Sequence, residues 1–399
     1  MINLEVNSVN IFLNLLLSVL SRLVPKKRNL VLFGAGRGEV YKGNPKYIFE
    51  HIISKHGRFN EFWITGNKII YHKLKKVNKP VLYKYSLKGF IAVLRAQFII
   101  IDFSVKDFSY MGTLPGRFNI IQTWHGIALK HIGLDEYENH KSILKKSLIK
   151  SVYACIKKYF QTLEYKKYKF IIAASETEAI NIEKAFNTDK IRITGFPRND
   201  TLFEQYDKEL LPVKLKEAKT IILYAPTFRD NGFNKAPFSE SFLVQLDEYL
   251  VKNRSIMLIK KHPHDKSLTV TEYQNIIDVS LQYDDIQQLL CFTDILVTDY
   301  SSVFFDFVLT GKPVIFYSYD YEYYLSQCRG MYYDYYETLP GPFAKDESQL
   351  MNLVISCKKW SVSKDYRQRY NEFTERFHKY RDNCSTARFI SELEALQRS

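Results

Sequence analysis

Short runs of apolar, β-branched and aromatic residues alternate with longer helical stretches along most of this chain, in two successive blocks. The runs that predict strands are 29–33, 61–65, 80–83, 98–102, 119–123, 170–173 and 191–194 in the first block, and 220–225, 255–260, 295–298 and 314–317 in the second. Helical stretches in the second block are roughly 238–252, 284–292 and 302–310. Continuous apolar strands that alternate with helices are typical of parallel sheets covered on both faces. The pattern therefore predicts an α/β protein with two Rossmann-like domains that face each other across a cleft.

Size and composition agree with two globular domains. A charged, loosely patterned segment at 201–219 separates the blocks and is predicted to be a linker. With 399 residues, of which 46% are hydrophobic and 25% charged, the chain can build two separate cores. Its five cysteines are odd in number and lack metal-ligand spacing, which argues for a reducing compartment with neither a disulfide framework nor a zinc site.

The formal net charge of +14 calls for an acidic partner, which could be nucleic acid, anionic lipid or a phosphorylated substrate. Residues 9–24 are rich in Leu, Val and Ile, and Lys26, Lys27 and Arg28 follow them. This stretch is shorter than the roughly 20 residues of a transmembrane helix, and its charge follows the apolar part, unlike that of a signal peptide. Polar side chains recur every three or four residues, at Asn7, Asn10, Asn14, Ser18 and Ser21. We therefore predict that 1–28 forms an in-plane amphipathic membrane segment; the alternative is a helix packed on its own domain.

Polar clusters follow five of the predicted strands directly. They are Trp124-His125-Gly126, the segment 195–200, the segment 225–230, the segment 260–265, and Asp299-Tyr300-Ser301-Ser302. In open parallel sheets, ligands bind outside the carboxyl ends of the strands. The five clusters are therefore the candidate functional residues.

Several of these residues have the chemistry of an anion site. Ser301 and Ser302 lie where a helix is predicted to begin, and the N–H groups and dipole of a helix N-terminus favour anions. Lys260, Lys261 and Arg192 add the positive charge that a diphosphate requires. The alternatives are that the serines only cap the helix and that the lysines form a solvated strand end.

Three further residues could bind hydroxyl groups or move protons. Asp306, one turn into the predicted helix, could hold a ribose or polyol hydroxyl, or could be an ordinary helix-face carboxylate. His125 and His262 could carry protons near neutral pH, and Gly126 permits a tight turn that leaves the His125 imidazole at the cleft edge. A packed turn histidine is the alternative for His125.

The glycine-rich stretch 34–38 does not complete a dinucleotide-binding motif. Glu39 stands where the pattern G-x-G-x-x-G requires its last glycine. We therefore predict a glycine-rich turn without a bound cofactor.

Longer runs resemble the CDP-glycerol glycerophosphotransferase family, which primes and polymerises wall teichoic acids and some capsules. The resembling runs are 44–47 (NPKY), 122–126 (QTWHG), 195–200 (GFPRND), 224–229 (YAPTFR), 261–263 (KHP) and 298–306 (TDYSSVFFD). The resemblance spans roughly 29–390. It implies a GT-B-like fold with an N-terminal acceptor domain at 29–200 and a C-terminal CDP-polyol donor domain at 220–399 that includes the C-terminal helices.

The resemblance also implies roles for residues. His125 and His262 match the catalytic histidines of the family. The donor-binding positions that it implies are Trp124, Gly126, Arg192, Pro226, Thr227, Lys260, Lys261, Ser301, Ser302 and Asp306. The chain departs from the family at Ile127 and Ala128, where Thr-Pro is usual, so the polyol carried could be glycerol, ribitol or a relative.

These observations predict an enzyme that moves a polyol phosphate from a CDP-polyol donor to a lipid-linked saccharide or polymer acceptor. We expect no cofactor, no metal and no nucleic acid partner. We expect a peripheral location at the cytoplasmic face of the cell membrane, on anionic lipid, with the lysine-rich segment 141–169 adding affinity. Two alternatives are a GT-B glycosyltransferase that uses a nucleotide sugar and a non-catalytic membrane-surface or nucleic-acid-binding protein.

Overall fold

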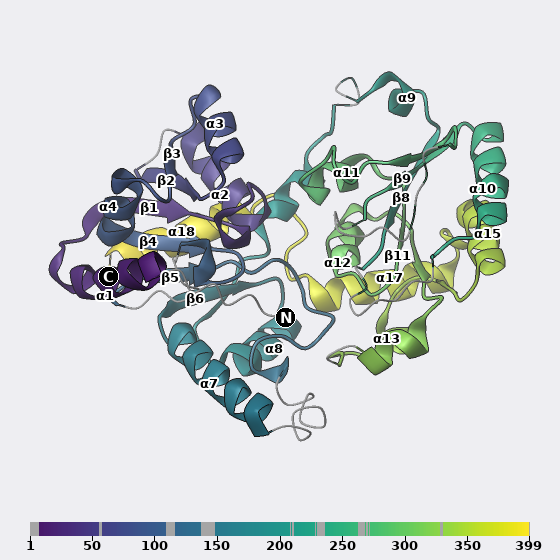
Figure 1. Cartoon of the computed structure of the whole chain (residues 1–399). Helices are drawn as coiled ribbons and strands as arrows, with labels where there is room; N and C mark the ends of the chain where they lie inside the picture. The colour runs from purple at the N-terminus through teal and green to yellow at the C-terminus, as the bar shows by residue number, and fades with distance from the viewer. Residues whose placement is uncertain are drawn as a thin grey trace. The chain divides into compact units, whose positions relative to one another are not determined.

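The computed structural model divides into two compact units, each built on one parallel sheet. It describes residues 8–55, 58–108, 116–136, 148–207, 209, 211–227, 229, 236–261, 268, 270, 272–327 and 330–398. The first unit comprises 1–125, 132–200 and 384–399, and the second comprises 126–131 and 201–383. Helices lie on both faces of each sheet (Figure 1).

The first unit contains a seven-stranded sheet in the order β3-β2-β1-β4-β5-β6-β7, with every pairing parallel. Its strands are β1 (Lys27–Phe33), β2 (Asn60–Thr65), β3 (Val81–Tyr83), β4 (Ala96–Ile101), β5 (Ile120–Gln122), β6 (Tyr168–Ala173) and β7 (Ile191–Ile193). Its described helices are α1 (Ser8–Leu23), α2 (Gly43–Ser54), α3 (Lys68–Lys76), α4 (Leu87–Arg95), α7 (Leu148–Tyr165), α8 (Glu176–Phe186) and α18 (Ser385–Arg398).

The second unit contains a six-stranded parallel sheet in the order β10-β9-β8-β11-β12-β13. Its strands are β8 (Thr220–Ala225), β9 (Ser255–Ile259), β10 (Ile276–Asp278), β11 (Ile295–Thr298), β12 (Val314–Tyr317) and β13 (Phe343–Ala344). Its described α-helices are α9 (Val213–Lys216), α10 (Glu240–Lys252), α11 (Ile286–Phe292), α12 (Val303–Phe307), α13 (Tyr321–Gln327), α14 (Tyr335–Thr338), α15 (Glu347–Ile355), α16 (Cys357–Trp360) and α17 (Lys364–Phe377). The strand order reverses between β8 and β11, so the carboxyl ends of these two strands flank the switch point where such sheets bind ligands.

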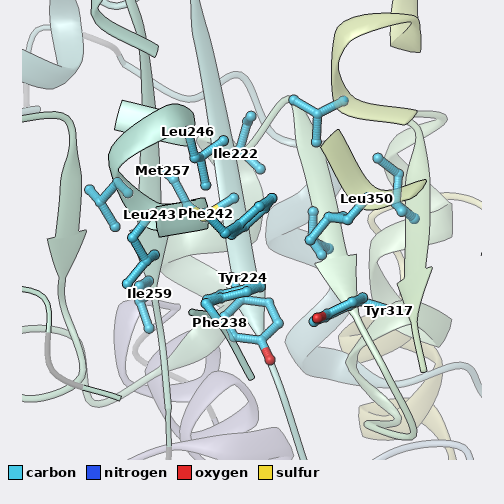
Figure 2. Packing of buried hydrophobic residues seen from close by; sticks show 14 of the residues in the cluster. Ile222, Tyr224, Phe238, Phe242, Leu243, Leu246, Met257, Ile259, Tyr317 and Leu350 are labelled. Carbon is cyan, nitrogen blue, oxygen red and sulfur yellow. The ribbon is translucent and has the colours of Figure 1, made fainter. Parts of the chain in front are cut away.

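Side chains alternate between the two faces of the second sheet. Ile222 and Tyr224 of β8 pack with Leu246 of α10 and Leu350 of α15 in one buried cluster (Figure 2). On the same face, the ring of Phe238 lies 4.8 Å from that of Tyr224. Burial on both faces explains why these strands read as continuous apolar runs in the sequence.

Several helices begin at a residue that the local sequence supplies. A side-chain oxygen accepts a backbone N–H of the first turn in each of them, which satisfies a donor that has no partner within the helix. The capping residues are Asn67 for α3, Ser86 for α4, Ser175 for α8, Ser239 for α10, Asp285 for α11, Asp346 for α15 and Ser363 for α17.

The predicted strands are all present, within a few residues of their predicted ends. Two strands, β10 and β13, were not predicted. They are three and two residues long and lie at the two edges of the second sheet, so they carry too little of the apolar pattern to be recognised.

Helix α18 belongs to the first unit, although the predicted donor domain at 220–399 included it. The buried Asp200 carboxylate accepts the N–H groups of Ser385 and Thr386 at 2.9 and 2.8 Å, which caps the start of α18. The Phe389 ring then lies 5.7 Å from that of Phe170 in β6. These contacts join residues far apart in sequence, so the local pattern could not predict them.

Helix α1 packs inward through Leu17 and Ser21, both buried. The Ser21 hydroxyl donates to the Ser18 carbonyl at 3.0 Å and accepts the Arg117 N–H at 3.0 Å. Ser21, one of the five regularly spaced polar residues, is therefore an internal contact, as the alternative of a helix packed on its own domain requires; Asn7, and the side chains of Asn10 and Asn14, lie outside the described residues. Four apolar side chains of α1 are 55–73% exposed, namely Phe12, Leu15, Val19 and Leu23, and Arg22 is exposed as well. Among the described residues, no helix combines the length and apolar character needed to cross a bilayer.

Candidate active site

His125 lies at the carboxyl end of β5 in the first unit, in a turn whose backbone is unusual. Trp124 is buried and has φ 51°, a left-handed conformation that a bulky residue rarely adopts, and Gly126 has φ 120°. The turn leaves His125 exposed, with its ring 4.3 Å from that of Trp124. Its Nδ1 is 3.5 Å from the Asp102 carbonyl oxygen. This carbonyl favours a proton on Nδ1, which makes Nε2 the basic nitrogen.

The buried side chain of Asn44 holds this turn through hydrogen bonds. Asn44 was not among the candidate site residues predicted from the sequence. Its amide nitrogen donates to the carbonyls of Thr123 and Trp124 at 3.0 and 2.8 Å. Its amide oxygen accepts the Arg198 N–H at 3.1 Å, and the Arg198 guanidinium donates to the His125 carbonyl at 2.8 Å. The only sequence signal for Asn44 was that it lies in a run, 44–47, that resembles the family. The structure shows that this run and the run 195–200 meet at the His125 turn.

The glycine-rich loop after β1 bonds to carboxylates of its own unit. The Gly36 N–H donates to Asp102 at 3.1 Å and the Arg37 N–H donates to Asp107 at 2.6 Å. Burial raises the pKa of Asp102 to about 6. Burial and the nearby Asp102 raise the pKa of Asp107 as well. The N–H groups that could have faced a ligand phosphate are thus directed at protein carboxylates.

In the second unit, Pro226 and Thr227 follow β8 and lie beside the turn that follows β11, because these two strands pair. The Thr227 N–H donates to the buried Asp299 carboxylate at 2.8 Å. The Thr227 hydroxyl oxygen is buried and has no hydrogen-bond partner among the described residues. A buried hydroxyl without a partner is costly, and a bound ligand would relieve that cost.

Ser301 and Ser302 are half-buried in the turn after β11. Ser302 precedes the five-residue helix α12 with helical backbone angles, and its side chain makes no capping hydrogen bond. The helix-cap alternative therefore does not describe the Ser302 side chain. Asp306 is 1% exposed and accepts a hydrogen bond from the Gln287 amide at 2.9 Å. The proposal that Asp306 binds a ribose or polyol hydroxyl of the substrate stays a prediction.

Lys260 and Lys261 follow β9, which pairs with β8 on the side away from β11. Their side chains face residues near β10. The Lys260 ammonium donates to the Ser280 carbonyl at 2.8 Å, and the Lys261 ammonium is 3.1 Å from the Asp278 carboxylate. His262 lies outside the described residues. The ends of β9, β8 and β11 therefore bring together all of the predicted second-unit clusters that are described.

Arg192 belongs to the first unit. It lies in β7, the edge strand of the first sheet, and pairs with Glu392 of α18 at 2.9 Å. Its proposed contact with a diphosphate stays a prediction.

An open cavity of about 450 Å³ lies beyond the carboxyl ends of β12 and β13. Its lining consists of four tyrosines, two acidic residues, one lysine and one serine, namely Tyr319, Tyr321, Tyr323, Tyr336, Asp320, Glu322, Lys345 and Ser318. Among the described residues, no three side chains of the types that bind metals gather into a cluster.

The sequence matches a known family over almost its whole length. Residues 16–394 match the family described as CDP-Glycerol:Poly(glycerophosphate) glycerophosphotransferase. The chain belongs to this family. The family resemblance inferred from the motifs is therefore confirmed, and the match includes both units.

Relatives and solved structures agree with this membership. A Staphylococcus aureus teichoic acid glycerol-phosphate transferase is 30% identical over 394 residues, covering 93% of each chain. A Bacillus spizizenii teichoic acid poly(glycerol phosphate) polymerase is 29% identical and covers 88% of this chain and 89% of its own. The wall teichoic acid polymerase TagF superposes with a TM-score of 0.76 at 22% identity, over 98% of this chain and 93% of its own. The predicted fold class, α/β with two Rossmann-like units, is confirmed.

Proposed function

We propose that this chain transfers glycerol phosphate from CDP-glycerol to a hydroxyl of a lipid-linked acceptor or growing teichoic-acid polymer, with release of CMP. The observation that carries the proposal is the family match over 16–394. The transferase relative, which covers 93% of both chains, supports the choice of glycerol phosphate.

In the proposed reaction, the acceptor hydroxyl attacks the β-phosphorus of CDP-glycerol. The new bond joins the acceptor oxygen to that phosphorus, and the bond to the bridging oxygen breaks, so CMP leaves with its electron pair. His125 accepts the acceptor proton, because it is exposed and its Nε2 is the basic nitrogen. Phosphoryl transfer otherwise depends on positioning and on stabilisation of charge.

The donor is proposed to bind at the carboxyl ends of β9, β8 and β11. Thr227, whose buried hydroxyl has no hydrogen-bond partner among the described residues, and Ser302, whose hydroxyl makes no capping bond, would donate to the diphosphate. Lys260, Lys261 and His262 would balance its charge.

A donor-choice experiment tests the function. CDP-glycerol, CDP-ribitol and a UDP-sugar are each titrated into the purified protein, and transfer of radiolabel to an acceptor glycolipid is followed. We expect binding and transfer with CDP-glycerol. Transfer from the UDP-sugar alone would instead support the glycosyltransferase alternative, and binding of none of the three would overturn the proposal.

Thr227→Val should weaken CDP-glycerol binding by about 10-fold, because a hydrogen bond to a charged group contributes roughly 1.5–3 kcal/mol. The same substitution should keep or raise the melting temperature, because it removes a buried hydroxyl that has no partner in the part of the chain that the structure describes. Calorimetric titration and thermal unfolding measure the two effects. Thr227→Ser, which keeps the hydroxyl, is the matched control. Unchanged affinity in Thr227→Val would remove Thr227 from the donor site.

We also propose that the chain works as a peripheral protein at the cytoplasmic face of the cell membrane, on anionic lipid. Two exposed apolar faces of the first unit support this location. One is the outward face of α1 described above, and the other is the α7 face formed by Ile156, Tyr159, Phe160 and Leu163, which are 38–63% exposed. Lys157 and Lys158 adjoin the α7 face and are exposed, which suits an anionic surface. Residues 141–147 of the predicted lysine-rich segment lie outside the described residues.

Replacing Leu15, Val19 and Leu23 together with serine should lower affinity for vesicles of phosphatidylglycerol and phosphatidylcholine by about 10-fold or more, because each buried aliphatic side chain contributes roughly 1.5–3 kcal/mol. Vesicle co-sedimentation measures the change. Leu281→Ser, at a still more exposed leucine of the second unit, should have no effect. Equal binding of the triple variant and the wild type would exclude α1 as an anchor.

A further inference from the structure

Arg229 sits at the centre of a buried ionic cluster that links three loops of the second unit. Its guanidinium binds Asp320 through two hydrogen bonds of 2.7 and 2.9 Å. The same guanidinium lies 2.8 Å from the Asp299 carboxylate and donates to the Thr227 carbonyl. We call these four residues, Thr227, Arg229, Asp299 and Asp320, the Arg229 clasp.

The clasp lies beside the proposed donor site. Thr227 follows β8, Asp299 follows β11 and Asp320 follows β12, so one guanidinium joins the loops at three adjacent strand ends. Asp299 also accepts the Thr227 N–H at 2.8 Å, which closes a ring of contacts between the first two loops. Ser301 and Ser302 come two and three residues after Asp299.

Arg229 is not placed to bind the diphosphate itself. The side chains of Arg229, Asp299 and Asp320 are 10%, 0% and 2% exposed. Three hydrogen bonds use Nε, Nη1 and Nη2, and Nη1 also lies 2.8 Å from the Asp299 carboxylate, so every guanidinium nitrogen contacts another residue of the clasp. One cation and two carboxylates also leave the clasp with a net charge of −1, which does not attract a diphosphate.

Tyrosine rings enclose the clasp and hold it in one geometry. The guanidinium carbon lies 5.1 Å from the ring centroids of both Tyr300 and Tyr324 and 5.8 Å from that of Tyr319. The Tyr300 hydroxyl donates to Asp320 at 3.1 Å, and the Tyr335 hydroxyl donates to the Asp299 carbonyl at 3.2 Å. The planar guanidinium makes directed contacts to two carboxylates and one carbonyl, and a lysine ammonium could not reproduce this orientation.

The same tyrosines reach the segment that follows His125. The segment 126–131 belongs to the second unit, where Lys130 donates to the Tyr324 hydroxyl at 2.8 Å and His131 donates its N–H to the Gly330 carbonyl at 3.1 Å. The Tyr324 ring stacks on that of Tyr300 at 3.8 Å. Ile127, where the chain departs from the family pattern, is buried in this segment.

We infer that Arg229 is a positioning residue for the donor site, holding the Thr227 and Asp299–Ser302 loops in the geometry that receives the diphosphate. This assignment rests on the proposed function. It adds a residue that does not contact the donor and that acts through the loops which do.

Arg229→Lys tests the inference, because it keeps the positive charge but removes the planar guanidinium and its paired hydrogen bonds. We expect the dissociation constant for CDP-glycerol to rise by about 10-fold or more, with a higher KM for the donor and a smaller change in kcat. Lys312→Met is the matched control. It breaks an ion pair with Asp294 at the amino ends of β12 and β11, so it should lower stability without changing donor affinity.

A double-mutant cycle separates positioning from general damage. If Arg229 acts through Thr227, then Thr227→Val should cost about 10-fold in donor affinity in the wild type and less than about threefold in Arg229→Lys. Additive effects, or a normal dissociation constant in Arg229→Lys, would overturn the inference. If Arg229→Lys does not fold, Asp320→Asn replaces it in the cycle, because its amide can still accept one of the two hydrogen bonds. Failure of the wild type to bind CDP-glycerol would contradict the proposed function, whereas normal binding by the variant contradicts only the role of Arg229.

Discussion

Replacing His125 with alanine should reduce turnover by about 100-fold or more, the lower end of the range for general acid–base catalysis. The affinity for CDP-glycerol should stay within a few-fold of the wild type. His125 belongs to the first unit, whereas the proposed contacts to the donor phosphates come from the second. Single-turnover kinetics and calorimetric titration measure the two quantities separately.

Thermal unfolding provides the control for this variant. The His125 side chain is exposed, so its removal should leave the melting temperature nearly unchanged. His262→Ala should differ by weakening donor binding along with turnover, since it follows Lys260 and Lys261 in sequence. Near-normal turnover in His125→Ala, or a loss of donor binding in proportion to rate, would show that His125 is not the base.

Asn44→Ala should reduce turnover by at least about 10-fold and lower the free energy of unfolding by about 2–4 kcal/mol. The buried side chain bonds to two carbonyls and one N–H, and each buried group left unpaired costs roughly 1–3 kcal/mol. The rate should fall because Asn44 holds the left-handed Trp124 and, through Arg198, the His125 carbonyl. Donor affinity should change less than turnover, because the proposed contacts to the donor phosphates lie in the second unit.

Asn119→Ala is the matched control for Asn44→Ala. Asn119 also donates to a backbone carbonyl of the first unit, that of Gln97 at 2.9 Å, but it lies at the amino end of β5. Its replacement should lower stability and leave turnover unchanged. If the two variants lose stability and activity in the same proportion, Asn44 is a structural residue only.

The strand-end clusters illustrate how much of the site the sequence could predict. Each cluster follows a predicted strand, so its place at a carboxyl end follows from the strand assignment alone. Which clusters are neighbours follows from the strand order, and β8, β9 and β11 could be ordered only in the structure. The local pattern also cannot reveal long-range pairs, such as that of Arg192 with Glu392 in a helix 200 residues later.

The N-terminal helix shows a second limit. The regular spacing of its polar residues predicted an amphipathic helix that lies on a membrane, with a helix packed on its own domain as the alternative. The structure buries Ser21 against Arg117 and exposes Phe12 and Leu23 instead. Periodicity identifies the faces of a helix, but the surface that it packs on decides which face is inward.

The sequence by itself determined the α/β class, the positions of the main strands, the polar clusters at their ends and the family of the chain. These features depend on local periodicity and on turn chemistry, which neighbouring residues encode. Only the tertiary structure decided that Asn44 meets Arg198 across 154 positions and that Arg229 meets Asp320 across 91. Such contacts depend on the order and register of the strands, and it is these long-range pairs that give the histidine turn and the donor loops their geometry.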